Sequence, residues 1–342
     1  MKKITKVCYL ILGSLFFVSC SQKENRLEPK RTVIAGVVEN FSDNANALVV
    51  YFCNPLSDEE QFVQSLIKSK GCFQAEHEYI FAQNLTIRFA GRSINLFVHP
   101  GDSVFVSIDG AKIESDFANA VTFSGDNSKL NKELYLWCDY SYNTIPTLFD
   151  YYASPEDFLA SVKKTFDIAQ DSIRAYAKKN GMSNSLRKWA FIDHKFSVTN
   201  HLMHYNAGAS TWDVFTNAIF DVFNENNFQT MYFPIYLSVC MNTFIESDAE
   251  ILRLFTEKKH AQVFQLIIKR LHEKVPKGIV RDMMLFSILK NGLTEMPELY
   301  DALPEIKIAF SQKFFNKKLD EIVKKNKVPG QALSETLLNT DR

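Results

Sequence analysis

Hydrophobic residues follow two different periods along the chain, and the change lies near Asn127. Between Thr32 and Phe123, short runs rich in β-branched and aromatic residues are separated by turn signals built from Gly, Pro, Asn and Asp. About seven to eight runs at this spacing predict an antiparallel β-sandwich. The expected strands are Val33–Val38, Ala47–Phe52, Gln61–Ile67, Cys72–Ile80, Leu85–Phe89, Ile94–Val98 and Ser103–Ile108.

Past residue 127 the apolar positions recur every three to four residues, which predicts helices of about 10–20 residues. Ser154, followed by a proline and two acids, has the sequence of a helix start, and Gly181 ends that helix. Ser247-Asp248-Ala249-Glu250 has the sequence of a capping box before another amphipathic segment. The predicted fold class is therefore α+β. It consists of a β-sandwich domain over 32–125, an α-helical domain over 126–325 and a polar tail over 326–342.

The N-terminus has the character of an export signal. Three lysines precede an apolar stretch over residues 7–18, which is shorter than the roughly 20 residues that a membrane-spanning helix needs. The stretch ends at Phe17-Val18-Ser19-Cys20, which resembles the lipobox of bacterial lipoproteins. The resemblance implies a signal peptide over 1–19, acylation of Cys20, and a lipidated polar stalk over 20–31.

With such an anchor, the protein is expected in the cell envelope. Two or more acyl chains hold a protein stably on a membrane, whereas a single chain does so only marginally. Ser21, and not Asp, follows the cysteine, so the outer membrane is the expected address and the membrane face stays open. In addition to the membrane, the expected partner is another envelope protein. The first 19 residues hold three lysines and no acid, which leaves 36 basic and 39 acidic residues without any block of like charge. This balance does not favour nucleic acid as a partner.

Four further cysteines remain in the mature chain: Cys53, Cys72, Cys138 and Cys240. No two of them have the Cys-x-x-Cys spacing of a redox pair or a zinc knuckle. Cys53 and Cys72 fall on strands expected to be neighbours, and the periplasm permits disulfides. A Cys53–Cys72 bridge and a pair of small buried residues are the two alternatives, and the second is favoured.

Three histidines are candidate metal ligands: His194, His201 and His204. Their spacing would suit zinc if residues 185–205 form one helix. The apolar positions of that segment lie on its other side, so exposed helix histidines are the favoured interpretation, and no metal or other cofactor is expected. The sequence contains no Gly-x-Ser-x-Gly, His-Glu-x-x-His, Walker-type or dinucleotide-binding motif.

Two segments carry a resemblance to a known family. They are Phe97–Val104, which contains the turn His-Pro-Gly-Asp, and Phe123–Asn131. Together with the lipobox and the strands, they resemble the N-terminal part of Bacteroidota lipoproteins that end in a thioredoxin-like thiol–disulfide oxidoreductase domain. The resemblance covers roughly residues 15–180 and implies a β-sandwich followed by a helical region. It carries over no redox residues, because the chain has no Cys-x-x-Cys at a helix start.

Two functions are consistent with these features. The favoured one is a lipid-anchored cell-envelope protein with a binding or assembly role and no catalytic centre of its own. The alternative is the non-catalytic portion of a thiol–disulfide oxidoreductase whose thioredoxin-like domain is lost or supplied separately. In addition, Asp102-Ser103-Val104 and Asp171-Ser172-Ile173 resemble O-glycosylation sites of Bacteroidota periplasmic proteins.

Overall fold

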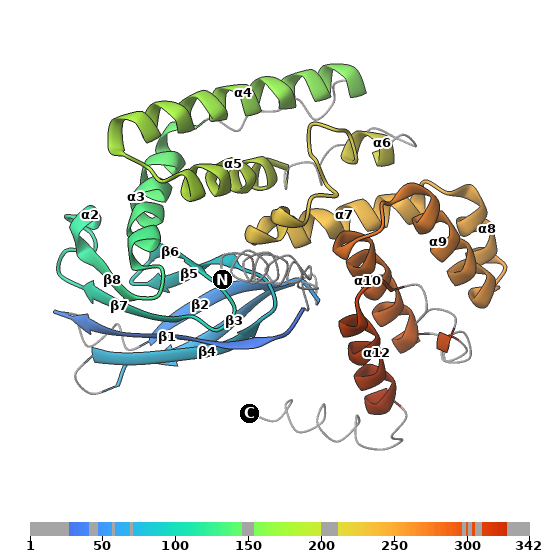
Figure 1. Ribbon diagram of the computed structural model, residues 1–342, viewed down its shortest axis with the longest axis horizontal. Coiled ribbons are helices and arrows are strands. Elements are labelled where there is room, and N and C mark those ends of the chain that lie inside the picture. Colours follow the sequence, from blue (N-terminus) through green and yellow to red (C-terminus); the bar gives the residue numbers. More distant parts are fainter. Residues whose placement is uncertain are drawn as a thin grey trace, which may run out of the picture.

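The structure of the chain is a computed structural model, which describes residues 27–40, 47–56, 59–68, 71–145, 154–199, 211–295, 299, 303–304 and 310–326. The expected signal peptide and Cys20 lie outside these residues, and so do His201 and His204. The described part is a β-sandwich followed by α-helices, which confirms the predicted α+β class (Figure 1).

The sandwich consists of two sheets whose inner faces share one hydrophobic core. One sheet has the strand order β4-β1-β7-β8 and the other has the order β3-β2-β5-β6. Ile34 and Val106 from the first sheet pack in this core with Leu48 and Ile87 from the second. The strands are β1 (Lys30–Glu39), β2 (Ala47–Asn54), β3 (Glu59–Leu66), β4 (Cys72–Tyr79), β5 (Gln83–Phe89), β6 (Arg92–Val98), β7 (Ser103–Asp109) and, after the short helix α2 (Phe117–Ala120), β8 (Val121–Gly125).

One strand pair differs from the prediction of an antiparallel sandwich. β1 and β7 are parallel, with Ile34 opposite Val104, whereas the other described pairs are antiparallel. Side chains alternate between the two faces in parallel and antiparallel strands alike. The hydrophobic pattern therefore predicts the strands correctly but carries no information about their relative direction.

Gly36 allows a close approach inside the sandwich. In β1 every second residue from Thr32 to Val38 is buried, and Gly36 belongs to this row. A Cβ atom at this position would lie 2.0 Å from the carbonyl oxygen of Val106 and 2.5 Å from the ring of Phe73. Both distances are well inside van der Waals contact, so only glycine fits between β7 and this ring.

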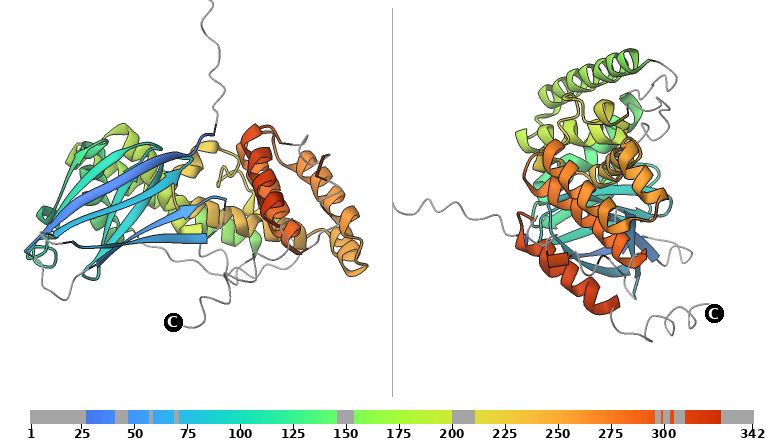
Figure 2. Two further views of the ribbon diagram at one scale, coloured as in Figure 1. Left: turned by 90° about the horizontal axis from the view of Figure 1, so that it is seen from below. Right: turned by 90° about the vertical axis from the view of Figure 1, so that its right-hand side faces the viewer.

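The helices follow the sandwich in sequence and cover one side of it. In Figure 1, α3 runs from the sheets up to α4 and α5, and α7 to α12 lie beside the sandwich. Figure 2 shows the sandwich and α8–α12 at opposite ends of the molecule. The described helices are α3 (Ser128–Thr144), α4 (Pro155–Asn180), α5 (Asn184–Thr199), α6 (Thr211–Phe215), the 3₁₀ helix η4 (Glu225–Gln229), α7 (Tyr232–Glu246), α8 (Ala249–Thr256), α9 (His260–Lys274), α10 (Ile279–Glu295) and α12 (Lys313–Asn326).

α4 begins and ends where the sequence predicts. The Ser154 hydroxyl accepts a hydrogen bond of 3.2 Å from the backbone N–H of Asp157, which is a standard N-cap. Gly181 ends the helix with a positive φ of 68°, a conformation that glycine adopts without strain. The predicted apolar face is buried as well: Phe158, Val162, Phe166, Ala169 and Ile173.

The start of α8 differs by one residue from the predicted capping box. The N-cap is Asp248, whose carboxylate accepts hydrogen bonds from the N–H groups of Glu250 and Ile251 at 3.0 and 3.2 Å. Ser247 instead donates its hydroxyl to the carbonyl oxygen of Phe244 at 3.2 Å, at the end of the preceding helix. Both residue types cap helices well, so the sequence alone did not decide between two neighbouring candidates.

The sandwich and the helices are joined by a shared hydrophobic cluster. Phe97 of β6 packs there with Leu134 of α3 and Trp189 of α5. Two polar contacts add to it: the N–H of Met231 donates to Asn84 at 2.8 Å, and Lys290 donates to the carbonyl oxygen of Leu56 at 2.8 Å. Among the described helices, none combines the length and the apolar character needed to cross a membrane.

Candidate functional site

The two cysteines considered for a disulfide lie in different sheets. Cys53 is near the end of β2 and pairs with Glu60 at the beginning of β3, whereas Cys72 begins β4 after β3 has ended. The premise that they lie on neighbouring strands is therefore wrong, and the structure forms no bridge between them. Cys53 is buried and Cys72 is exposed, so only Cys53 fits the expectation of a small core residue.

His194 is not the exposed histidine that the sequence predicted. It lies near the end of α5, and its Nε2 atom is buried without a hydrogen-bond partner. Burial lowers the pKa of His194 to about 4, so the imidazole is neutral at physiological pH. The helix pattern places a residue on a face, but it does not show which neighbouring element covers that face. In the described part of the chain, no group of three or more His, Cys, Asp or Glu side chains could hold a metal ion.

The two segments that carried the family resemblance contact each other. Asn127, with a left-handed φ of 53°, donates to the carboxylate of Asp102 and lies 2.9 Å from Nδ1 of His99. The buried Asn131 accepts a hydrogen bond of 2.6 Å from the N–H of Phe97. These contacts fasten the β6–β7 turn to the start of α3, which is a structural role.

A second polar group lies between α5, α3 and η4. The Thr230 hydroxyl donates to the Asp193 carboxylate at 2.6 Å, and burial raises the pKa of Asp193 to about 7. Burial, helped by the charge of Asp193, also raises the pKa of Cys138. A thiol acts as a nucleophile only as the thiolate, so Cys138 is not suited to covalent chemistry.

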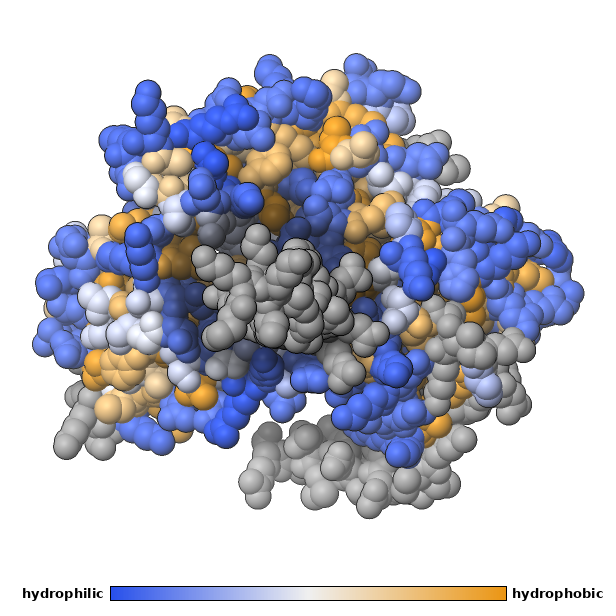
Figure 3. Space-filling model, viewed as in Figure 1, coloured by the Kyte–Doolittle hydropathy of each residue, from blue (hydrophilic) through white to orange (hydrophobic). Residues whose placement is uncertain are grey.

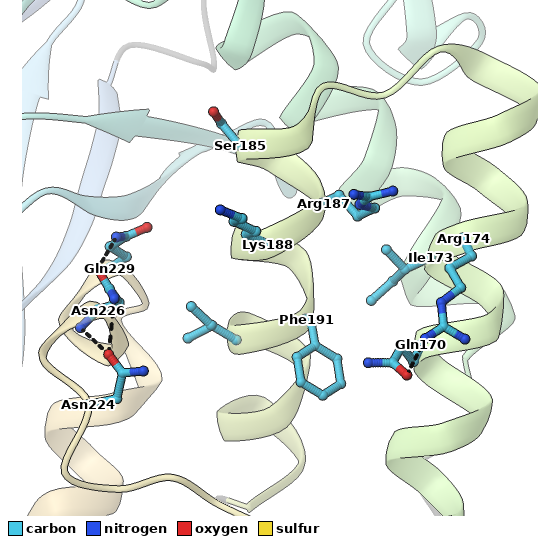
Figure 4. Close-up of a pocket in the computed structure, with 11 residues that line it drawn as sticks. Gln170, Ile173, Arg174, Ser185, Arg187, Lys188, Phe191, Asn224, Asn226 and Gln229 are labelled. Atoms are coloured by element: carbon cyan, nitrogen blue, oxygen red, sulfur yellow. Dashed lines mark hydrogen bonds between the residues drawn. The ribbon is translucent and has the colours of Figure 1, made fainter.

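A groove between α4, α5 and η4 is the best candidate for a binding site (Figure 4). Its volume is about 760 Å³, which lies within the range of about 300–1,000 Å³ that is usual for small-molecule sites. α5 forms the floor, with α4 on one side and η4 on the other. The groove is lined by Gln170, Ile173, Arg174, Ser185, Arg187, Lys188, Phe191, Ile192, Asn224, Asn226 and Gln229.

The charges in the groove have one sign. Arg187 points toward α4 and Lys188 toward η4 (Figure 4), and both side chains are exposed. Arg174 is held by Gln170 at 2.7 Å and by Asp171 at 3.1 Å. The lining residues that the structure describes include no carboxylate, although Arg174 is paired with Asp171, so Arg187 and Lys188 are the cations that the groove presents most directly to a ligand. Such a surface attracts anions, and guanidinium groups also bind them through paired hydrogen bonds.

Amide side chains line the η4 wall and are ordered by one another. The Asn224 side chain caps η4 by accepting a hydrogen bond of 3.0 Å from the N–H of Asn226. Gln229 donates to the side chain of Asn226 at 3.4 Å. The floor contributes Phe191 and Ile192, which are half-buried. In Figure 3 the outer surface over α4 is hydrophilic, and hydrophobic residues show beneath it toward α5.

A smaller cavity adjoins the groove. It measures about 410 Å³ and lies between the sandwich, α3, α5 and η4. The groove and the cavity share two lining residues, Ser185 and Gln229. The other lining residues are mainly apolar: Ala82, Phe97, Leu130, Leu134, Leu186 and Trp189, with His99 and Asn127.

The comparisons with known proteins add no assignment to this geometry. No protein-family model matches the sequence, and no curated protein is significantly similar to it.

The groove cannot be recognised from the sequence. Its members come from three segments that are far apart in the chain, and each segment is unremarkable alone. The weak signals were the adjacent Arg187 and Lys188 in the first turns of α5, and the asparagine-rich segment that forms η4 and its N-cap. Exposed lysines and arginines on helices are common, so only their juxtaposition with amides from another segment distinguishes them.

Proposed function

We propose that this protein is a lipid-anchored cell-envelope protein that binds an anionic ligand in the groove between α4, α5 and η4. The lipobox ending at Cys20 supports the anchor. The observation that carries the binding role is that Arg187 and Lys188, with Arg174 in its ion pair with Asp171, line the groove, and that the described lining residues include no carboxylate. The lining residues that the structure describes include no His, Cys, Asp or Glu, so the geometry favours binding over catalysis.

The binding role is tested by titrating the mature chain with tripolyphosphate and with trigalacturonate, followed by calorimetry at two salt concentrations. We expect at least one of these anions to bind, and more weakly at high salt because the contacts are electrostatic. Lys188→Gln should weaken binding at least fivefold. The matched control is Lys164→Gln, which removes an exposed lysine of α4 that does not line the groove. Equal losses in both variants would refute the proposal, and so would a failure to bind these two anions together with a failure to bind an anion that carries an apolar chain, such as octyl phosphate.

The anchor is tested separately with the full-length chain expressed in a bacterial host. We expect mass spectrometry to find acyl chains on Cys20 after cleavage behind residue 19, and the protein to partition into detergent. Cys20→Ser should move it to the aqueous phase. An unmodified Cys20 in protein recovered from the membrane would contradict the lipid anchor.

The second candidate is the non-catalytic portion of a thiol–disulfide oxidoreductase. It is favoured by the contact between the two segments of the family resemblance, Asn127 with Asp102 and Asn131 with Phe97. In this role the helices would position a separate thioredoxin-like partner. The test is insulin reduction by a thioredoxin-like protein encoded nearby, with and without this chain. A rate that does not depend on the chain would exclude this role.

A further inference from the structure

We infer that the anion bound by the groove is amphiphilic: its charged head lies at Lys188 and Arg187, and its apolar chain enters the adjoining cavity. This inference rests on the proposed binding function and specifies the class of ligand. It commits to a monomeric, single-chain anion such as an alkyl phosphate or a fatty acid.

The chemistry of the cavity is the first argument. Phe97, Leu134, Leu186 and Trp189 are among its lining residues, and they also belong to the buried cluster that joins the sandwich to the helices. The volume of about 410 Å³ is not filled by the described side chains. Six of its ten described lining residues are apolar, the others being His99, Asn127, Ser185 and Gln229, and burial of an alkyl or aromatic group against the apolar ones is favourable.

The placement of the cavity is the second argument. Ser185 and Gln229 line both the groove and the cavity, so the two spaces meet at these residues. Lys188 is three positions after Ser185 in α5, on the same side of the helix, and Figure 4 shows it pointing toward η4. The indole N–H of Trp189 donates to the carbonyl oxygen of Gln229 at 3.0 Å, which fixes the boundary between the two spaces.

This order of groups matches the order within an amphiphile. A head at Lys188 forms ionic contacts in the open groove, where water remains available to its other oxygens. The chain then passes two polar, adaptable side chains, Ser185 and Gln229, and continues past Trp189 and Leu186 into the cavity. A ligand without a chain would leave the cavity empty, and one without a charge would leave the cations without a partner.

The test measures the affinity of the mature chain for butyl, hexyl, octyl and decyl phosphate, each below its micelle concentration. We expect affinity to rise about three- to fourfold for each added methylene until the cavity is full. Ala82→Phe, at a half-buried position of the cavity wall, should lower the affinity for decyl phosphate toward that for butyl phosphate. Lys188→Gln should weaken all four ligands by a similar factor and keep the dependence on chain length, whereas Lys164→Gln should change neither.

The outcomes separate this inference from the binding function. If tripolyphosphate binds in a Lys188-dependent manner but affinity does not depend on chain length, the groove binds hydrophilic anions and the amphiphile inference is wrong. If neither class of anion binds, both proposals fail. Vesicles of phosphatidylglycerol distinguish a lipid bilayer as the source: binding to vesicles without binding to monomeric alkyl phosphates would also overturn the inference.

Discussion

The buried carboxyl group of Asp193 provides a quantitative test of the contact between α5 and η4. Asp193 is half-buried, and its carboxylate receives a hydrogen bond of 2.6 Å from the Thr230 hydroxyl. Burial raises its pKa from 3.8 to about 7. Asparagine has nearly the same shape, keeps an oxygen that can accept the Thr230 hydroxyl, and never ionises. We therefore expect Asp193→Asn to stabilise the protein, and increasingly so as the pH rises.

The sign and the size of this stabilisation follow from the pKa of Asp193 in the folded and in the unfolded chain. Between about pH 4 and pH 7 the folded carboxyl keeps its proton whereas the unfolded one has lost it, so the stability of the native chain falls as the pH rises. The pKa of Asp193 rises from 3.8 in the unfolded chain to about 7 in the folded one, and each pKa unit corresponds to about 1.36 kcal/mol. Above pH 7 the ionised carboxyl therefore lowers the free energy of unfolding by about 4 kcal/mol. The weaker hydrogen bond to a neutral amide offsets about 1 kcal/mol. The penalty is about 1.6 kcal/mol at pH 5, so the net gain for Asp193→Asn is about 3 kcal/mol at pH 8 and about 0.6 kcal/mol at pH 5.

The assay is urea unfolding followed by tryptophan fluorescence at pH 5, 6, 7 and 8, with native and variant chains side by side. His194, whose low pKa makes stability rise with pH between about 4 and 6.5, acts equally in both chains and cancels in the difference. Asp167→Asn is the matched control, because Asp167 is exposed on α4 in an ion pair with Lys163. Its effect should stay within about 0.5 kcal/mol at every pH. A difference between Asp193→Asn and the native chain that does not change with pH would show that the carboxyl group is not enclosed.

Three further substitutions test the packing, each by urea unfolding. Gly36→Ala should destabilise the sandwich by about 3 kcal/mol or more, because the new Cβ would lie 2.0 Å from the carbonyl oxygen of Val106. Asn131→Ala should cost about 1–3 kcal/mol by leaving the buried N–H of Phe97 without its acceptor. Asp282→Ala should cost about 2 kcal/mol, because this buried carboxylate accepts three hydrogen bonds just before α12. A loss below 0.5 kcal/mol in any of the three would contradict the corresponding contact.

Local features of the fold were predictable because their causes are local. The strands of the sandwich and the ends of α4 follow from the alternation of hydrophobic residues and from the caps at Ser154 and Gly181. Features that depend on a second segment were not predictable. The parallel pairing of β1 with β7 and the burial of His194 both depend on which element lies alongside.

The separation of Cys53 from Cys72 illustrates the same limit. The chain passes from one sheet to the other between β3 and β4, where the hydroxyl of Ser65 bonds to the backbone of Gln74 at 2.9 and 3.2 Å. β3 and β4 are therefore consecutive in the sequence but lie in different sheets. A strand buries its hydrophobic residues equally well in either sheet. The hydrophobic pattern therefore does not show that the chain passes from one sheet to the other between β3 and β4.

The sequence by itself determined the α+β class, the approximate extents of most strands and the ends of α4, and its resemblance to a lipobox leads us to propose an anchor at Cys20. These features depend on residues that are close together in the chain, so the spacing and type of those residues are enough to predict them. Only the tertiary structure brought Arg187 and Lys188 of α5 together with Arg174 of α4 and the amides beside η4, and placed an apolar cavity next to them. A binding site of this kind is a property of distances between separate segments, and those distances are set by how the helices pack on the sandwich.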